Sequence, residues 1–155
     1  MSVYLRDATV EDIPALVAVL HAGFEEYRGR LDPPSGVHNE TAETIRKKLN
    51  MDSAVVAEND GDVIGCVFYV HEASCLDLGR LAVLPQYRRQ GVGRALVEYV
   101  ENRARALQVT RVELGVRLAL PRLQAYYEAL GYRPIRRGAH EGYAESTYVV
   151  LAKDV

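Results

Sequence analysis

The chain has 155 residues, of which 48% are hydrophobic and 26% are charged, a balance typical of globular proteins. This length suits one domain, and the net charge of -2 disfavours a nucleic-acid partner. The chain has no run of about 20 apolar residues, and its first residues form neither a basic nor an apolar leader. We therefore expect a cytoplasmic protein without a membrane span.

The N-terminal third predicts one strand followed by two helices. Residues 3–7 alternate as a strand does, and Thr9 is an N-cap candidate for the first helix. The apolar side chains of that helix recur at helical spacing and are Ile13, Leu16, Val17, Leu20, Phe24 and Tyr27. Residues 28–39 hold several glycines and prolines and predict a loop, after which a second helix begins at Asn39 or Thr41.

The remainder of the chain predicts a mixed sheet with helices. Residues 53–58 and 63–70 are rich in β-forming residues, and the turn from Asn59 to Asp62 between them is a strong hairpin signal. The further expected elements are a strand over 76–84, a helix over 91–107, a strand over 111–116, a helix over 121–130, and strands over 132–136 and 145–152. The inner face of the 91–107 helix is expected to hold Val92, Leu96, Val100, Ala104 and Leu107. This order is neither a run of βαβ units nor a series of hairpins, so we expect an α/β domain with one central sheet.

Cysteine and histidine usage gives no sign of a metal site. Cys66 and Cys75 lack the paired spacing of a metal or redox motif, and the four histidines are scattered. Both cysteines have apolar neighbours, which predicts buried, reduced thiols. We therefore expect no metal.

The stretch between the fourth expected strand and the helix after it is the most informative one. Gly91 and Gly93 carry no Cβ, so an oxygen of a ligand can approach the main chain closely. Free amides and the helix dipole favour a phosphate there, and Arg88, Arg89 and Arg94 can add charge-assisted hydrogen bonds. The hypothesis is a ligand with a diphosphate. The alternative is a tight turn with solvated arginines.

Two segments resemble the motifs of the GNAT superfamily of acyl-CoA-dependent N-acyltransferases. The first follows the family pattern of Gln or Arg, two residues, Gly, any residue, then Gly or Ala, and runs Arg88-Arg89-Gln90-Gly91-Val92-Gly93. The second follows the pattern of Tyr-Glu, two residues, Gly and an aromatic, and runs Tyr127-Glu128-Ala129-Leu130-Gly131-Tyr132. The expected order of elements is also similar to that of the family.

The resemblance implies one N-acetyltransferase domain over residues 1–155, with about seven strands, about four helices and a splay between the fourth and fifth strands. It also implies direct transfer of an acetyl group from acetyl-CoA to an amine in a ternary complex, and it is compatible with a homodimer. The cosubstrate contacts that it implies are Leu81, Ala82, Val83, Arg88, Arg89, Gln90, Gly91, Val92, Gly93 and Arg94. The rival hypotheses are a non-catalytic acyl-CoA sensor or scaffold and a nucleotide-binding module.

Tyr127 is the general acid that the resemblance implies, because the tyrosine of this motif lies near the CoA sulfur in the family. A phenol with a pKa near 10 stays protonated at neutral pH and can donate to a thiolate. The alternative for Tyr127 is a half-buried packing residue, and Tyr126 is the neighbour most easily confused with it. Leu120 stands where many members carry an asparagine, so the local contact with the cofactor is lost or moved.

Asp77 is the candidate general base. It lies in an otherwise apolar strand, where a carboxylate is costly unless it is paired or functional. Asp77 shares strand parity with Leu81 and Val83, and by spacing it matches a strand position at which some GNAT members place a glutamate base. The structural alternative is an ion pair with Arg80 or Arg117. The rival bases are Glu72, Glu26, His140 and a water relay.

The acceptor pocket is expected between the first two helices, their connecting loop and the last hairpin. Its candidate side chains are Phe24, Tyr27, Arg30, Pro33, Pro34, His140 and Tyr143. The segment 138–143 is either a mobile loop over the site or an ordinary surface loop. A small amine, an amino-acid derivative and a protein amine all remain open as acceptors.

Overall fold

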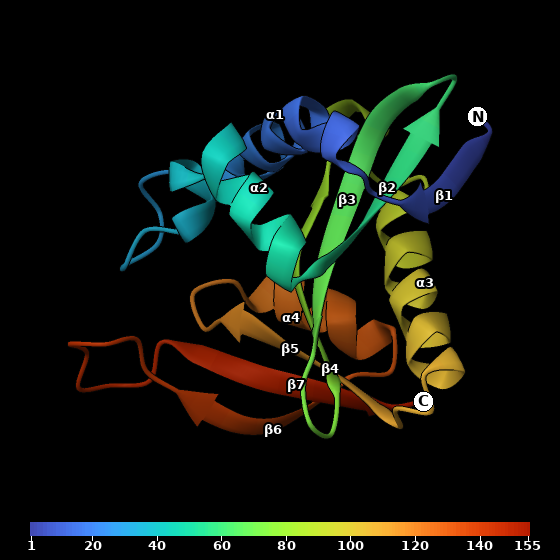
Figure 1. Ribbon diagram of the computed structural model, residues 1–155. Helices are drawn as coiled ribbons and strands as arrows, with labels where there is room; N and C mark the ends of the chain where they lie inside the picture. The colour runs from blue at the N-terminus through green and yellow to red at the C-terminus, as the bar shows by residue number, and fades with distance from the viewer.

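The computed structural model covers residues 1–155 and contains one seven-stranded sheet flanked by four α-helices (Figure 1). The strands are β1 (Val3–Asp7), β2 (Ser53–Asn59), β3 (Asp62–His71), β4 (Leu76–Val83), β5 (Arg111–Arg117), β6 (Arg133–Gly138) and β7 (Tyr148–Asp154). The helices are α1 (Ile13–Phe24), α2 (Ala42–Met51), α3 (Val92–Ala106) and α4 (Pro121–Ala129). The strand order across the sheet is β1-β2-β3-β4-β5-β7-β6. The expected α/β fold with a mixed central sheet is confirmed.

The sheet opens between β4 and β5, which form its one parallel pair. The two strands pair only from Leu76 to Leu78 on β4, although β4 continues to Val83 and β5 continues to Arg117. All other neighbouring strands are antiparallel. The second half of β4 therefore has a partner strand on one side only, and the expected splay is confirmed.

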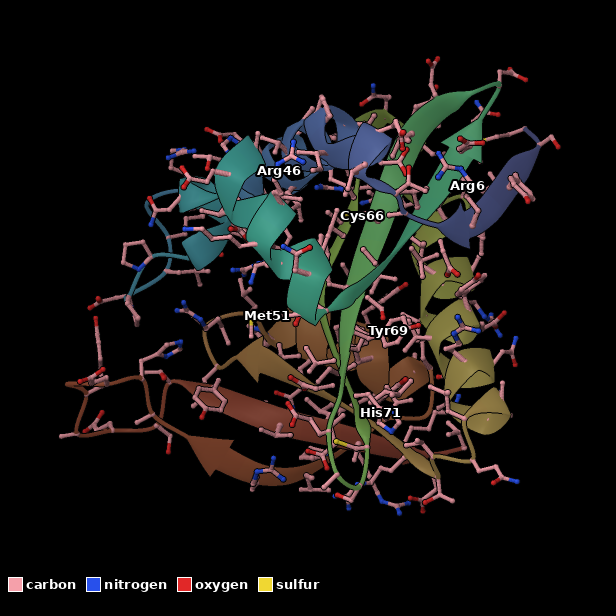
Figure 2. All side chains as sticks on the ribbon, viewed as in Figure 1. Arg6, Arg46, Met51, Cys66, Tyr69 and His71 are labelled. Atoms are coloured by element: carbon pink, nitrogen blue, oxygen red, sulfur yellow. The ribbon has the colours of Figure 1, made fainter.

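Helices cover both faces of the sheet. α1 and α2 lie together on one face, and α3 and α4 cover the other (Figure 1). The hydrophobic core under α1 and α2 contains Leu16 and Leu20 of α1, and a second core under α3 and α4 contains Leu96 of α3. Strand residues alternate between these cores, so on β3 Cys66 joins the first and Tyr69 joins the second (Figure 2). The apolar periodicity of the sequence thus corresponds to two separate packing layers.

A bulge in β4 changes which way its side chains face. The register between β3 and β4 shifts, and Arg80 has a positive φ of 52° at this point. Leu78 before the bulge and Leu81 after it both pack against the α3/α4 core. Asp77 therefore lies on the opposite face from Leu81 and Val83, toward α1 and α2. The expectation that these three residues share strand parity is wrong, because the bulge inserts one extra residue between them.

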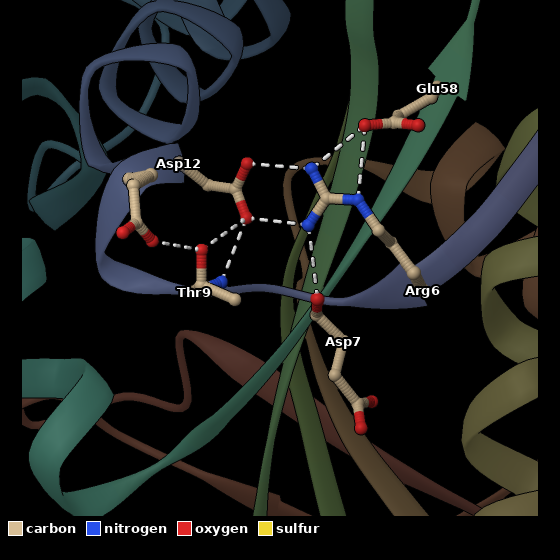
Figure 3. Close-up of polar contacts among 6 residues, drawn as sticks. Arg6, Asp7, Thr9, Asp12 and Glu58 are labelled. Atoms are coloured by element: carbon tan, nitrogen blue, oxygen red, sulfur yellow. Dashed lines mark hydrogen bonds and ion pairs between the residues drawn. The ribbon is translucent and has the colours of Figure 1, made fainter. Parts of the chain in front are cut away.

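A charged cluster joins the edge of the sheet to the start of α1 (Figure 3). Arg6 on β1 donates to the two carboxylate oxygens of Asp12 at 2.7 and 2.8 Å, and to Glu58 on β2 at 2.8 and 3.0 Å. Asp12 also accepts a hydrogen bond from the Thr9 amide at 2.7 Å, as Figure 3 shows. The cluster links β1 and β2 to the residue that precedes α1, and the end of α1 lines one wall of the site described below.

The observed boundaries depart from the expected ones in a few places. Tyr27 lies in a short 3-10 helix after α1, and residues 36–39, expected as loop, form another. Leu107 is 44% exposed just beyond the end of α3, so it does not belong to the inner face of that helix. The last strand begins at Tyr148. Both cysteines are free and buried, as expected, and none of the helices has the length and apolar content needed to cross a bilayer.

Candidate active site

The opening between β4 and β5 leads into a cavity of about 910 Å³. This volume lies in the range of small-molecule sites. From the α3/α4 face, the lining residues come from the start of α3 and from α4. From the α1/α2 face, they come from the end of α1, the loop that follows it and the last hairpin. The cavity is therefore lined from both layers of the protein.

Main-chain amides without partners form a row at the start of α3. None of the consecutive amides from Arg89 to Arg94 donates a hydrogen bond within the chain, whereas the amides on either side do. Gly91 is the N-cap, with a φ of 85° that suits glycine. A Cβ on Gly93 would lie 3.0 Å from the Tyr126 hydroxyl, so glycine keeps this approach open. Free amides at the positive end of a helix can bind an anion such as a diphosphate.

The three arginines of this segment differ in their partners. Arg88 donates to the Glu26 carboxylate at 2.7 Å and to the Gly23 carbonyl at 2.8 Å. Arg94 pairs with a glutamate one turn along α3 at 3.0 Å on an exposed surface. Arg89 is exposed and has no such partner. Arg89 is thus the arginine free to meet a ligand, whereas Arg88 ties the segment to the end of α1.

The wall of the cavity includes the unpaired edge of β4 as well as this row of amides. Every residue that the resemblance assigns to the cosubstrate lines the cavity except Gln90, which is exposed. From Gly79 to Val83 the strand presents an edge without a β5 partner, and such an edge can accept an extended ligand through main-chain hydrogen bonds. Leu120, at the position of the family's asparagine, also lines the cavity, so this part of the wall is apolar.

Comparison with known families identifies the chain. The model of the acetyltransferase (GNAT) family matches residues 19–132, which include the free amides and Tyr127. The chain belongs to the GNAT acetyltransferase family. A probable N-acetyltransferase 14 from Danio rerio is 37% identical over 81 residues, which cover 50% of this chain and 29% of the relative. An amino-acid acetyltransferase from Azotobacter vinelandii is 31% identical over 105 residues, covering 66% of this chain and 22% of the relative. The chain thus spans less than a third of the length of either relative.

Two solved structures share the fold of this GNAT chain at low sequence identity. The PaiA N-acetyltransferase from Thermoplasma acidophilum, in complex with coenzyme A, has a TM-score of 0.80 at 20% identity, with 100% of both chains covered. The ribosomal-protein-S18-alanine N-acetyltransferase from Escherichia coli has a TM-score of 0.77 at 20% identity, with 99% of this chain and 94% of that chain covered. These likenesses establish the fold of the whole chain.

In this GNAT chain Tyr127 reaches the cavity from α4. The residue is 5% exposed and packs edge-on against Tyr126 and Tyr132, with ring centroids 5.3 and 6.0 Å away. Its hydroxyl makes no hydrogen bond within the chain, and it is not among the fully buried polar atoms that lack a partner, so it is open to the cavity. Burial raises the pKa of the Tyr127 phenol. A proton on this hydroxyl therefore stays in place at neutral pH.

Asp77 lines the cavity without an ion-pair partner. Arg80 pairs with Glu40 at 3.1 Å, and Arg117 donates to the Pro33 carbonyl at 2.7 Å. Neither of the ion pairs considered for Asp77 is present. The carboxylate is thus free to meet an acceptor on the α1/α2 side of the opening.

The environment of Asp77 differs from that of the other candidate bases. Burial, followed by the charges of Glu72 and Glu113, raises the pKa of Asp77. Among the rival bases, Glu26 and His140 line the cavity, whereas Glu72 does not. Glu26 accepts the hydrogen bond of an arginine, and burial lowers the pKa of His140. Asp77 is the carboxylate in the cavity lining that has no hydrogen-bonded partner, and a raised pKa moves it toward the range useful for a base.

The expected acceptor residues separate into two groups. Phe24, Tyr27 and His140 line the cavity, and the Phe24 and Tyr27 rings meet edge-on with centroids 5.7 Å apart. Tyr143 lies outside the lining and donates its hydroxyl to Asp32 in the loop after α1. Of the two residues expected from the last hairpin, His140 therefore contributes to the cavity, and Tyr143 binds the hairpin to the loop after α1.

Part of the α1/α2 side of the cavity was not predicted from the sequence. Gly115 and Arg117 on β5 and Tyr148 on β7 all line it. Strand alternation was the available signal, because the buried Leu114 and Val116 place Gly115 and Arg117 on the other face. No group of three or more His, Cys, Asp or Glu side chains in the structure could hold a metal ion.

Proposed function

We propose that this chain transfers the acetyl group of acetyl-CoA directly to a primary amine in a ternary complex. The observation that carries the proposal is the row of partnerless amides from Arg89 to Arg94, which continues into the unpaired edge of β4 and leads to the Tyr127 hydroxyl. One continuous wall thus offers a diphosphate site, a strand edge for an amide-containing arm, and a proton donor.

Acetyl-CoA supplies an acetyl thioester that an uncharged amine can attack. In the overall reaction the carbon–sulfur bond breaks and a carbon–nitrogen bond forms. The amine loses a proton, which Asp77 accepts directly or through water, and the Tyr127 hydroxyl donates a proton to the departing sulfur. A lysine-like amine has a pKa near 10.4, so its deprotonation at pH 7 costs about 4–5 kcal/mol, which a base and desolvation can supply.

The two cysteines support direct transfer without an acyl-cysteine step. Cys66 is fully buried, and burial raises the pKa of its thiol to about 12. Cys75 does not line the cavity, and burial raises its pKa as well. A protonated thiol is a weak nucleophile, so neither cysteine suits the role of acyl carrier. Two reduced cysteines also fit a cytoplasmic location.

The test is a calorimetric titration with coenzyme A, followed by release of the CoA thiol from acetyl-CoA in the presence of a broad panel of amines. We expect binding and amine-dependent thiol release together. Binding without thiol release for any amine would contradict catalysis and favour the sensor hypothesis. Absence of binding at millimolar coenzyme A would overturn the proposal entirely.

A further inference from the structure

The α1/α2 side of the cavity has a floor made of two glycines. Gly79 on β4 and Gly115 on β5 both line the cavity, and both are exposed. A Cβ built on either residue would meet no atom within 4 Å. No side chain therefore fills the space above the main chain at these two glycines. The nearest side chains on the same faces of β4 and β5 determine which ligand can bind there.

Arg117 lies at the β5 end of this floor. It is half-buried, and its guanidinium donates to the carbonyls of Pro33 and Pro34 at 2.7 and 3.4 Å. These two acceptors hold the guanidinium in place but carry no charge. No carboxylate lies within ion-pair distance of Arg117, and the carboxylate of Asp32 in the same loop accepts the Tyr143 hydroxyl instead.

Arg117 differs from the other arginines of the cavity. Arg80, Arg88 and Arg94 each pair with a glutamate. Arg89 has no carboxylate partner, but it is exposed and belongs to the row of free amides on the other side. Burial lowers the pKa of Arg117, yet a guanidinium remains charged at neutral pH. Arg117 has no ion-pair partner and uses part of its guanidinium for two main-chain carbonyls, so donors remain for an anionic group of a ligand.

Asp77 lies toward the other end of the floor, also without a partner. It faces the same side as Arg117, because its β5 neighbour Glu113 is an even number of residues from Arg117. At a rise of about 3.3 Å per residue, that interval places the two positions roughly 13 Å apart along the strand. A negative and a positive group thus flank one open floor.

We propose that the acceptor is a small amine that also carries a carboxylate, with the carboxylate bound by Arg117 and the amine facing the Asp77 end of the floor, where water links it to the Asp77 carboxylate. This inference rests on the proposed acetyl transfer and names the class of its substrate. A guanidinium can bind a carboxylate through two parallel hydrogen bonds, which fixes both position and orientation. The ring of Tyr148, paired across from Arg117 on β7, and the ring of His140 border this end of the cavity. They offer apolar contact to the remainder of an amino acid.

The experiment compares matched acceptors that differ only in the carboxylate. Phenylalanine is assayed beside phenylethylamine and phenylalanine amide, and leucine beside isoamylamine and leucine amide, with thiol release from acetyl-CoA as the readout. We expect kcat/KM to be at least about 10-fold higher for the carboxylate member of the preferred set, since a site built to bond a polar group rejects analogues that lack it.

Substitution of Arg117 then tests its role in specificity. Arg117→Gln keeps a donor for the Pro33 carbonyl but removes the charge. We expect it to raise KM for the carboxylate acceptor by about 10- to 100-fold while KM for acetyl-CoA stays constant. Arg117→Lys should recover part of the loss. Arg137→Gln, which removes an exposed arginine on β6 outside the cavity lining, is the matched control and should behave as wild type.

A binding measurement separates this inference from the proposed transfer. The CoA-bound protein is titrated with each member of the acceptor sets. Carboxylate-dependent binding that Arg117→Gln abolishes supports the site even if no thiol is released, and in that case the proposed transfer fails alone. Transfer to carboxylate-free or peptide amines with equal or greater efficiency leaves the proposed transfer standing and overturns the carboxylate site. Neither binding nor transfer with any member overturns the carboxylate site, and the proposed transfer is then decided by coenzyme A binding and the broad amine panel.

Discussion

Tyr127 is buried, and its hydroxyl makes no hydrogen bond within the chain. These two properties support a prediction for substitution of this one residue. Tyr127→Phe removes the oxygen and keeps the ring that packs against Tyr132. We expect kcat to fall by about 100-fold, within the range for loss of a general acid, while affinity for acetyl-CoA stays near wild type. Stopped assays of thiol release and calorimetry measure the two quantities separately.

Tyr126→Phe is the matched control for Tyr127→Phe. Tyr126 is the sequence neighbour, its ring touches that of Tyr127, and it is 37% exposed beside Gly93. We expect it to change kcat much less. The reverse ranking of the two variants would assign the acid role to Tyr126, and equal small effects would show that neither tyrosine donates the proton.

Some single residues of the site could be predicted from the sequence, whereas their tertiary contacts could not. The glycine pattern and the Tyr-Glu motif were sufficient to locate the amide row and Tyr127. The partner of Arg88 could not be predicted, because Glu26 is separated from it by 62 positions and the contact depends on how α1 is placed. The absence of an ion-pair partner for Asp77 could not be predicted for the same reason, because tertiary contacts hold the two arginines considered as its partners elsewhere.

The close contact between helix α1 and strand β4 gives a second prediction. A Cβ on Gly23 would lie 2.9 Å from the Ala82 Cβ and 3.5 Å from the Val83 amide nitrogen. These atoms belong to the main chain of β4 or are bonded directly to it, so they cannot rotate away. We expect Gly23→Ala to destabilise the fold by about 1–3 kcal/mol and to weaken coenzyme A binding, because Ala82 and Val83 form the cavity wall. Urea denaturation and calorimetry measure both effects.

Gly36→Ala is the control for this contact. Its new Cβ would lie 3.3 Å from one Nη atom of Arg80, the end of a flexible side chain, so the clash can relax. We expect little loss of stability. If Gly23→Ala were as stable as Gly36→Ala, then α1 and β4 could move apart enough to admit a methyl group at little cost, and the close helix–strand contact would not be needed for stability.

The Arg6 cluster at the start of α1 gives a third prediction, for the pH dependence of stability. Hydrogen bonds from Arg6 hold the pKa of Asp12 below its usual value. Because the folded pKa is lower than the unfolded one, the Asp12 contribution is complete above the unfolded value of about 3.9 and is lost as pH falls through the folded value. We expect Asp12→Asn to cost about 1–3 kcal/mol at pH 6–7 and progressively less below about pH 4.

Glu141→Gln is the control for the Asp12 prediction, since Glu141 is an exposed carboxylate that makes no hydrogen bond or ion pair. Urea denaturation of the wild type and both variants across pH 3–7 gives the comparison. A difference between Asp12→Asn and wild type that stayed constant across this range would show that Asp12 does not titrate with unfolding, and the assigned role of Arg6 would be incorrect.

Element order was readable from the sequence because each segment carries its own periodicity. The β2–β3 hairpin follows from alternating β-formers and the Asn59–Asp62 turn, and α3 follows from apolar residues at helical spacing. The bulge in β4 was not readable, because it depends on pairing with β3 and on a positive φ at Arg80. That single inserted residue decides that Asp77 and Leu81 lie on opposite faces.

At the scale of the whole molecule, the splay brings two layers to one site. Tyr127 comes from the α3/α4 layer, and Asp77 and Arg117 face the α1/α2 layer. A continuous sheet would keep these groups apart. The family resemblance predicted the splay, whereas composition and periodicity could not, because the pairing of β4 with β5 is a contact between segments distant in the sequence. The acceptor side of the cavity is also built from such distant segments.

The last prediction concerns the response of the whole fold to its cosubstrate. A ligand that binds only the folded state at 100 times its dissociation constant stabilises that state by about 2.7 kcal/mol. For a chain of this size, coenzyme A should therefore raise Tm by roughly 5–10 °C. Hydrogen exchange should slow at the amides from Arg89 to Arg94 and along the free edge of β4 from Gly79 to Val83. Adenosine diphosphate, which lacks the pantetheine arm, should slow exchange only at the first set. Protection of β6 and β7 in place of these segments would mean that the ligand binds elsewhere, since neither strand borders the amide row.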